Sequence, residues 1–245
     1  MGFLKSSPQK KANSLYQQGM QAQKNNNLPE AISCFEQAIV IMDEIGERQG
    51  ELVSRFNLGT IYIQTENYPK AKTNLEKALS LSKELGKQEE QINTNFMLGR
   101  CLRFSEDANG AIPYLEEAAQ LCRQLNADET LPSVLNNLGL AYRHAHNPSK
   151  ARLTYEEALS LPAMKRDKRM EGVVQNNLAM TFVDMGDLEK AKIHLDDSLK
   201  LRQGIGDVRG TAETLQNMVE VYTQAGDSKQ AAEYARQLEN IMGGG

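Results

Sequence analysis

The chain has 245 residues, of which 40% are hydrophobic, and a formal net charge of −4 at pH 7. General nucleic-acid-binding proteins are basic, so this charge argues against that class. No apolar run approaches the roughly 18 residues that a membrane-spanning helix requires. The cysteines, Cys34, Cys101 and Cys122, form no CxxC pair, which favours reduced, buried thiols in a cytoplasmic protein.

The first ten residues, MGFLKSSPQK, precede the repeating part of the chain and are predicted to form a flexible tail. They lack the apolar core of a signal peptide. They match the loose N-myristoylation pattern MGxxxS at Gly2, although the bulky Phe3 beside the acceptor glycine is unfavourable. Two interpretations stay open: a basic, unmodified tail, or a lipid on Gly2, which would be the one route to membrane contact.

Residues 11–242 repeat with a period of 40 residues. Units that begin at residues 11, 51, 91, 131, 171 and 211 align without a gap, which is typical of repeat architectures. Small residues recur in three columns, which would let neighbouring helices approach closely. The columns are Ala31, Ala71, Ala111, Ala151, Ala191 and Ala231; Ala38, Ala78, Ala118, Ala158 and Ser198; and Gly19, Gly59, Gly99, Gly139 and Ala179.

Two further columns predict where helices begin and end. Asn and Asp are strong N-caps because the side-chain oxygen accepts a free backbone N–H of the first turn. They occupy one column: Asn27, Asn67, Asp107, Asn147, Asp187 and Asp227. Gly and Asn are left-handed helix stops, and the second column reads Gly46, Gly86, Asn126, Arg166 and Gly206. Each unit is therefore predicted to be a helix A, a tight turn, a helix B and a stop.

Apolar residues between these marks recur at helical spacing, as Leu58, Tyr62, Leu75 and Leu79 illustrate. Neither helix of a unit can bury its stripe alone, so neighbouring units must stack. No period-2 alternation is long enough to suggest strands. The predicted fold is an all-α solenoid of six helix pairs.

Unit four departs from this pattern. Pro162 falls in the body of the expected helix B, where proline removes a hydrogen bond and clashes with the preceding turn. The stop glycine is also missing there, and the basic run KRDKR (165–169) follows. We predict a kinked or shortened helix B and an altered step between units four and five. A tolerated irregularity and a functional hinge or docking loop both remain open.

The pattern L-G-x-x-Y followed by A, an aromatic residue and A resembles the tetratricopeptide repeat (TPR). Leu138, Gly139, Tyr142, Ala151, Tyr155 and Ala158 match it directly. The 40-residue period is similar to a subgroup that includes kinesin light chain, Pins-type adaptors, rapsyn and bacterial peptide-sensing regulators. The resemblance implies a right-handed α-solenoid whose A helices line an inner, concave groove.

An asparagine column lies beside the Leu-Gly pair of helix A: Gln17, Asn57, Met97, Asn137, Asn177 and Asn217. In the resembling families, asparagine at this position holds the backbone of a bound extended peptide. An amide can donate and accept at once, which suits a peptide bond. The alternative is that asparagine simply fits beside the Leu-Gly packing site.

Flanking residues would give such a groove its character. Arg100, Arg103, Arg143 and His144 gather in units three and four, and Asp184, Glu213 and Glu220 gather in units five and six. Tyr16, Phe56 and Phe96 form an aromatic column near the N-terminus, unless they only pack between helices. If these charges act together, they favour a ligand with an acidic segment. The lysine of the family's carboxylate clamp for chaperone tails is missing before every column position.

Catalytic and metal sites are not predicted. His144, His146 and His194 are the only histidines, and neither their spacing nor that of the cysteines suits a metal. No nucleotide-binding or nucleophile motif occurs, so neither a cofactor nor an enzymatic activity is expected.

After the last helix B the chain ends in GGG (243–245), read as a flexible tail. An apolar face of Tyr234, Leu238, Ile241 and Met242 could then be left open for self-association. The sequence as a whole predicts a non-catalytic adaptor that binds a peptide or helical segment of another protein. The alternatives are a peptide-responsive regulator and a self-assembling structural unit.

Overall fold

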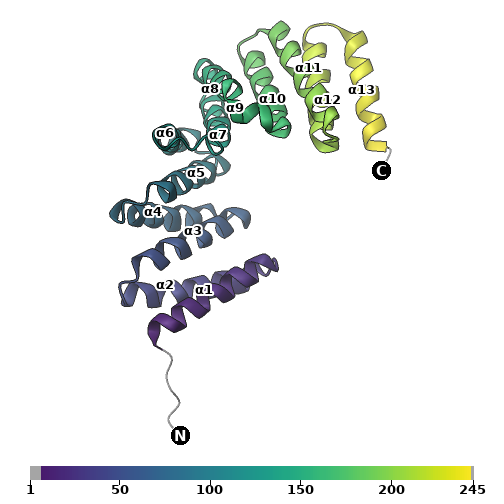
Figure 1. The fold of residues 1–245 in the computed structure, drawn as a ribbon. Coiled ribbons are helices and arrows are strands. Elements are labelled where there is room, and N and C mark those ends of the chain that lie inside the picture. The colour runs from purple at the N-terminus through teal and green to yellow at the C-terminus, as the bar shows by residue number, and fades with distance from the viewer. Residues whose placement is uncertain (1–6, 244–245) are drawn as a thin grey trace. The chain divides into compact units, whose positions relative to one another are not determined.

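The computed structural model describes residues 7–243, and within this range its regular structure consists of helices alone. The helices are α1 (Pro8–Lys24), α2 (Leu28–Glu44), α3 (Arg48–Gln64), α4 (Tyr68–Glu84), α5 (Gln88–Phe104), α6 (Ala108–Leu125), α7 (Leu131–His144), α8 (Pro148–Ser160), α9 (Pro162–Arg166), α10 (Lys168–Asp184), α11 (Leu188–Gly204), α12 (Val208–Gln224) and α13 (Ser228–Gly243) (Figure 1). The all-helical fold is as predicted. The A helices of the six repeats are α1, α3, α5, α7, α10 and α12, and each is followed by its helix B.

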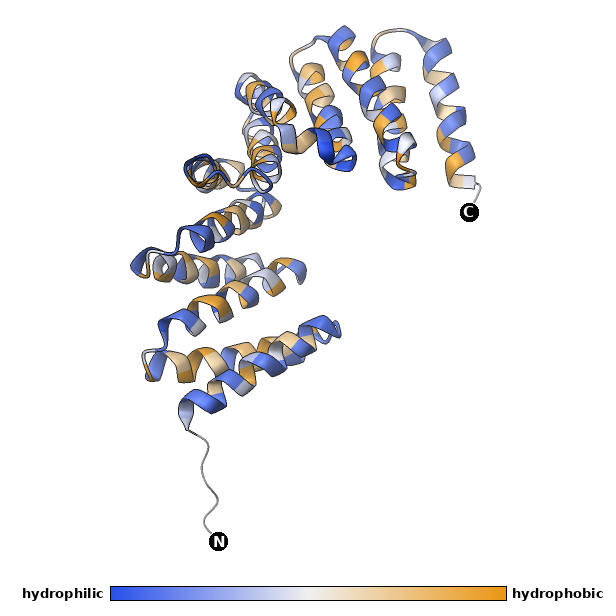
Figure 2. Cartoon of the chain, in the orientation of Figure 1, coloured by the Kyte–Doolittle hydropathy of each residue, from blue (hydrophilic) through white to orange (hydrophobic). Residues whose placement is uncertain are grey.

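The chain divides into two compact units, each made of several repeats: the first unit ends at Leu121 and the second begins at Cys122. We refer to the six 40-residue units of the sequence as repeats one to six. In the first unit, successive helices pack through apolar faces that Figure 2 shows in orange. Phe35, Leu58, Leu75 and Leu98 belong to one buried cluster that runs through α2, α3, α4 and α5. Each helix therefore covers its apolar stripe with its neighbours, as the repeat pattern requires.

In the second unit, α7 packs on α8, α10 on α11 and α12 on α13. Its fully buried side chains include Leu135, Tyr155, Leu195 and Leu215. One charged side chain lies among them: Arg202 of α11 is 1% exposed. Its Nη1 donates to the carbonyl of Gly210 (2.5 Å), to Thr214 Oγ1 (3.1 Å) and to Glu213 Oε2 (3.1 Å), so the buried guanidinium is paired and hydrogen-bonded.

The predicted caps and stops are largely confirmed. Five of the six side chains of the cap column accept a backbone N–H three residues on, at 2.8–3.3 Å: Asn67, Asp107, Asn147, Asp187 and Asp227. Asn27 makes no such bond because its amide donates instead to Glu30 Oε2 at 2.7 Å. Gly46, Gly86, Asn126 and Gly206 have positive φ, as left-handed stops do.

The columns of small residues are places of close helix approach. An added Cβ at Gly59 would lie 2.6 Å from Cγ of Leu75, and one at Gly139 would lie 2.5 Å from the ring of Tyr155. Ala31, Ala71 and Ala151 are completely buried. These positions have no room for a larger side chain, which is why the columns recur.

The first helix begins before the predicted start of the first repeat. Helix α1 starts at Pro8, three residues before the expected boundary at residue 11, because Ser7 Oγ caps it by accepting the Lys10 N–H. Residues 8–10 are therefore part of helix α1 and not of a flexible tail. At the other end, α13 runs to Gly243, the first residue of the predicted C-terminal tail. The candidate lipidation site Gly2 lies outside the described residues.

Helix B of repeat four is broken, as Pro162 predicts. Helix α8 ends at Ser160, Leu161 is extended (φ −69°, ψ 136°), and the short helix α9 begins at Pro162. Met164 of α9 is fully buried, so the segment after the break contributes a side chain to the core. Arg166, where the stop glycine is missing, lies in α9 and not in a left-handed turn.

The cysteines are free and buried, as expected. Burial raises the pKa of the Cys122 thiol to about 11. Across residues 7–243, none of the helices combines the length and the apolar character that crossing a bilayer would demand.

Candidate partner-binding groove

Two pockets lie along the same pair of A helices, α3 and α5, in the first unit. The first is lined by Leu52, Val53, Phe56, Glu90, Asn93 and Thr94. The second is lined by Thr60, Ile63, Gln64, Glu66, Tyr68, Met97, Arg100 and Phe104. We call the surface formed by these residues the α3–α5 groove. Early residues of both helices line the first pocket and later residues of both line the second, so α3 and α5 run in the same direction.

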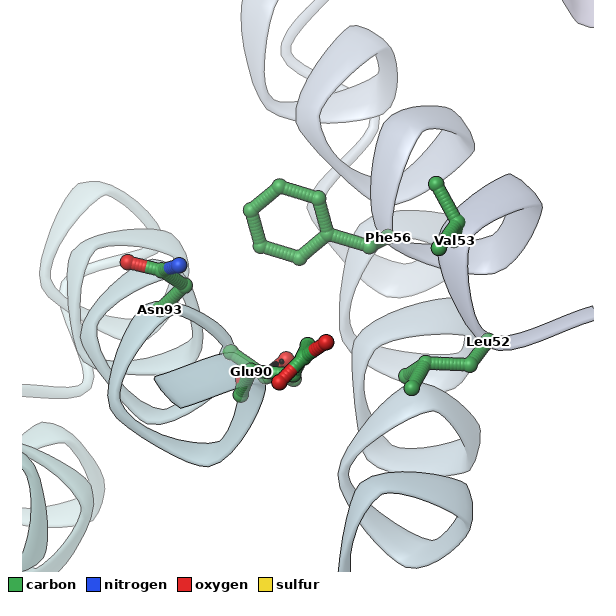
Figure 3. A pocket seen from close by; sticks show the side chains of 6 residues that line it. Leu52, Val53, Phe56, Glu90 and Asn93 are labelled. Atoms are coloured by element: carbon green, nitrogen blue, oxygen red, sulfur yellow. Dashed lines mark hydrogen bonds between the residues drawn. The ribbon is translucent and has the colours of Figure 1, made fainter. Parts of the chain in front are cut away.

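The first pocket is small and apolar, with a volume of about 130 Å³. Figure 3 shows Leu52 and Phe56 projecting from α3 toward Glu90 and Asn93 of α5, with Val53 beside Phe56. An engineered apolar cavity of about 150 Å³ accepts a benzene molecule. The pocket is therefore suited to one apolar side chain, with a carboxylate and an amide at its edge.

The second pocket is larger, about 450 Å³, and combines apolar walls with a cation. The guanidinium carbon of Arg100 lies 5.7 Å from the ring centroid of Phe96 and 5.8 Å from that of Phe104. The Arg103 guanidinium carbon lies 4.5 Å from the same Phe104 ring. Two rings and two guanidinium groups thus form a cation–π cluster at the C-terminal end of α5.

Arg100 is half-buried, and this burial lowers the pKa of its guanidinium. Arg100 Nη1 donates to Met97 Sδ, a weak acceptor, at 3.7 Å, and Glu66 lines the same pocket. Because an arginine side chain stays charged at neutral pH, the groove holds a partly desolvated positive charge. A carboxylate that enters this pocket would meet a charge with less water to displace than a surface arginine has.

The asparagine column behaves differently in the two units. In the first unit, Asn57 Nδ2 lies 3.4 Å from Met20 Sδ, a weak acceptor. Met97, which departs from the column, lines the second pocket beside Arg100.

In the second unit the column residues bond to the protein itself. Asn177 Nδ2 donates to Asn136 Oδ1 (2.9 Å), and Asn217 Nδ2 donates to Asn176 Oδ1 (3.0 Å). Asn137 Nδ2 donates to the Ser133 carbonyl at 2.9 Å. Amide pairs thus connect α7 to α10 and α10 to α12. These bonds support the alternative that asparagine serves packing at these positions.

The predicted basic middle and the predicted acidic C-terminal part are joined by an ion pair. Arg143 Nε lies 2.5 Å from Asp184 Oδ2, so a member of the basic group pairs with a member of the acidic group. The two residues sit at the C-terminal ends of α7 and α10, which the 40-residue repeat brings together. Glu213 of the acidic group pairs with Arg202 of α11. Glu220 and His144 are exposed.

The rings of the aromatic column differ in where they lie. The ring of Tyr16 packs on that of Phe35 in α2, with centroids 5.8 Å apart, so Tyr16 joins helices together. Phe56 lines the first pocket, and the ring of Phe96 makes a cation–π contact with Arg100. One of the three rings therefore lines the α3–α5 groove, and a second lies beside its arginine.

The four candidate self-association residues of α13 differ in exposure. Tyr234 packs on the ring of Tyr222 in α12, with centroids 5.2 Å apart. Leu238 and Ile241 are half-buried, and Met242 is 74% exposed.

Sequence reasoning missed several groove residues, among them Leu52, Val53, Ile63 and Phe104. They lie at helical spacing along the same faces as Phe56 and Arg100, and that spacing was the available signal. Within the described range, no three His, Cys, Asp or Glu side chains gather to hold a metal ion.

The sequence profile of the tetratricopeptide repeat matches residues 11–84, 90–162 and 171–242. No curated protein sequence matches the chain closely enough to count as a relative. Solved structures match its fold. TPR-like repeats of a putative kinesin light chain from Podosopora anserina are 17% identical, with a TM-score of 0.68 over 82% of this chain and 98% of that one.

The apo form of RapI is 13% identical, with a TM-score of 0.74 over 96% of this chain and 99% of that one. A Rap protein complexed with competence and sporulation factor is 16% identical, with a TM-score of 0.59 over 95% of this chain and 75% of that one. At such identities these likenesses concern the fold. Profile and fold agree with the repeat columns: this chain belongs to the tetratricopeptide repeat family.

Proposed function

We propose that this protein is a non-catalytic scaffold that binds a segment of a partner protein in the groove of its A helices. Proteins built from these repeats generally mediate protein–protein interaction. The observation that carries the proposal is the α3–α5 groove, with its apolar pocket at Leu52, Val53 and Phe56 and its cation at Arg100. Pockets that combine apolar walls with a few polar groups are typical of recognition sites.

A second observation concerns the chemistry of the partner. Two charged side chains, Glu66 and Arg100, line the second pocket. Half-burial between aromatic rings makes Arg100 a favourable neighbour for a carboxylate. The proposal therefore includes acidic character in the bound segment, because complementary charge steers the choice of partner.

Site-specific photo-crosslinking tests this proposal. A photoreactive phenylalanine replaces Asn93, which is exposed at the edge of the first pocket, and the protein is irradiated in a lysate of its source cells. The matched control carries the same group at Lys77, an exposed position on helix B α4. We expect one protein to crosslink from position 93 and not from position 77, and mass spectrometry then maps the crosslinked segment.

Charge reversal supplies the second arm of the experiment. Arg100→Glu should abolish the crosslink from position 93, while Lys77→Glu should leave it unchanged. If the same proteins crosslink from both positions, the groove is not where this protein meets its partner. If Arg100→Glu has no effect on a crosslink specific to position 93, the proposed acidic character of the bound segment is wrong.

A peptide-responsive regulator is the second candidate, and the interrupted helix B of repeat four favours it. Extended Leu161 between α8 and α9 is a natural place for a change in helix orientation. The likeness in fold to a Rap protein complexed with competence and sporulation factor points the same way. Small-angle scattering with and without the crosslinked segment, prepared as a synthetic peptide, tests this candidate. An unchanged radius of gyration at saturating peptide would eliminate it.

A further inference from the structure

The α3–α5 groove holds two pockets of different chemistry at a fixed separation. Phe56 lines the first pocket, and Gln64, eight residues later on α3, lines the second. On α5 the corresponding positions are Asn93 and Arg100, seven residues apart. With a rise of about 1.5 Å per residue, the two pockets are about 10–12 Å apart along the helices.

The corresponding groups of the second unit are already bonded within the protein. Asn177 and Asn217 donate to the amides of the preceding A helix, and Arg143 forms an ion pair with Asp184. A ligand that used the same groups would have to replace bonds that the protein already makes. In the first unit the Asn57 amide meets a sulfur atom, a weak acceptor, and the Arg100 guanidinium meets two aromatic rings and the sulfur of Met97.

We infer that the primary recognition site is the α3–α5 groove, and that it binds an extended peptide segment carrying an apolar side chain and a carboxylate three or four residues apart. This inference rests on the proposed function. The apolar side chain occupies the pocket of Leu52, Val53 and Phe56, and the carboxylate accepts hydrogen bonds from Arg100. The asparagine pairs of the second unit are structural.

The spacing distinguishes an extended ligand from a helical one. An extended chain advances about 3.3 Å per residue, so it covers 10–12 Å in three or four residues. In a helix, side chains four residues apart are only about 6 Å apart, and the same separation requires seven or eight residues. The volume of the first pocket, about 130 Å³, also fits a single inserted side chain better than the broad apolar face of a helix.

A panel of synthetic peptides tests the inference. Each peptide carries one leucine and one glutamate in a glycine–serine chain, separated by two to nine positions and in both orders. Binding is followed by NMR on protein with labelled methyl groups, using Leu52, Val53, Ile63 and Met97 as reporters in the groove and Leu138 as reporter in the second unit. We expect saturable shifts at the groove reporters, strongest at a separation of three or four and absent at Leu138.

Charge variants make the result specific. Lysine in place of the glutamate, or Arg100→Gln in the protein, should weaken binding about tenfold, as expected for loss of a charge-assisted hydrogen bond. Arg100→Lys keeps the charge and should retain part of the affinity. Arg143→Gln is the matched control and should have no effect, because Arg143 already pairs with Asp184. The methyl spectrum of each free variant reports whether it is folded.

Three results would overturn the inference: no saturable shift with any peptide, shifts centred on Leu138, or a best separation of seven or eight. Each is distinguishable from failure of the proposed function. If the photoreactive group at position 93 still crosslinks to a partner in an Arg100-dependent way, the protein binds partners in this groove. Only the chemistry and spacing inferred for the ligand are then wrong.

Discussion

The amide of Asn177 donates a 2.9 Å hydrogen bond to Oδ1 of Asn136, its neighbour one repeat earlier in the chain. Asn217 bonds to Asn176 in the same way. Asn136 and Asn176 are buried, 7% and 2% exposed, so each bond satisfies a polar group that water reaches poorly. A column that resembles a ligand-binding ladder therefore also holds successive A helices in register.

Removing one of these amides should destabilise the fold. Asn177→Ala leaves the buried Oδ1 of Asn136 without its donor, and we expect the free energy of unfolding to fall by about 1–3 kcal/mol. Asn57→Ala is the matched control, because its amide contacts the weak acceptor Met20 Sδ, and its loss should be clearly smaller. Urea denaturation measures both. Equal losses would mean that the amide pair contributes nothing beyond asparagine packing.

Gly139 should not tolerate a methyl group. A Cβ there would lie 2.5 Å from the buried ring of Tyr155, which is completely enclosed and cannot move aside freely. We expect Gly139→Ala to lower the free energy of unfolding by about 1–3 kcal/mol. Gly204→Ala is the control, since nothing lies within 4 Å of its Cβ, and alanine is the better helix former. A thermal melt that places both variants at the same midpoint would contradict the close approach of α7 and α8.

The Arg143–Asp184 pair should contribute little stability. Both side chains are partly exposed, 24% and 37%, so water and salt screen their attraction. A double-mutant cycle with Arg143→Ala and Asp184→Ala should give a coupling of about 1 kcal/mol or less, decreasing as salt is added. A larger coupling that salt does not change would show that the pair is shielded from water and has a structural role.

Stability should depend on pH through Cys122. Burial raises the pKa of its thiol to about 11 in the folded protein, above the ordinary value of 9.0. Below pH 9 both states are protonated. Between pH 9 and about 11 only the unfolded state loses the proton, so the free energy of unfolding falls, by less than about 1.4 kcal/mol per pH unit.

Lysines and tyrosines also titrate in that range, so the test is the difference between wild type and Cys122→Ala. Urea denaturation at several pH values should show the stability gap between the two proteins narrowing above pH 9 in favour of the variant. A gap independent of pH would mean that the thiol ionises equally easily in the folded and unfolded protein.

Much of this fold could be predicted from the sequence because its information is local and repeated. Side chains such as Asp187 and Asn147 cap the helix that begins one residue later, so their role depends only on nearby backbone. Gly139 and Ala151 could be assigned to packing because their columns recur in register. Pro162 predicted the interruption after α8, since a missing N–H acts on its own helix whatever surrounds it.

The site depended on contacts that no single repeat contains. The sequence placed Arg143 and Arg100 in one basic group, yet a partner 41 residues away neutralises the first, while Phe96 and Phe104 flank the second. The asparagine column likewise divides into pairs bonded between helices and an Asn57 that meets a sulfur atom. Periodicity determines which face of a helix a residue occupies. Which neighbour satisfies that residue is decided only when helices from different repeats pack together, because hydrogen bonds and ion pairs depend on distances of a few ångströms.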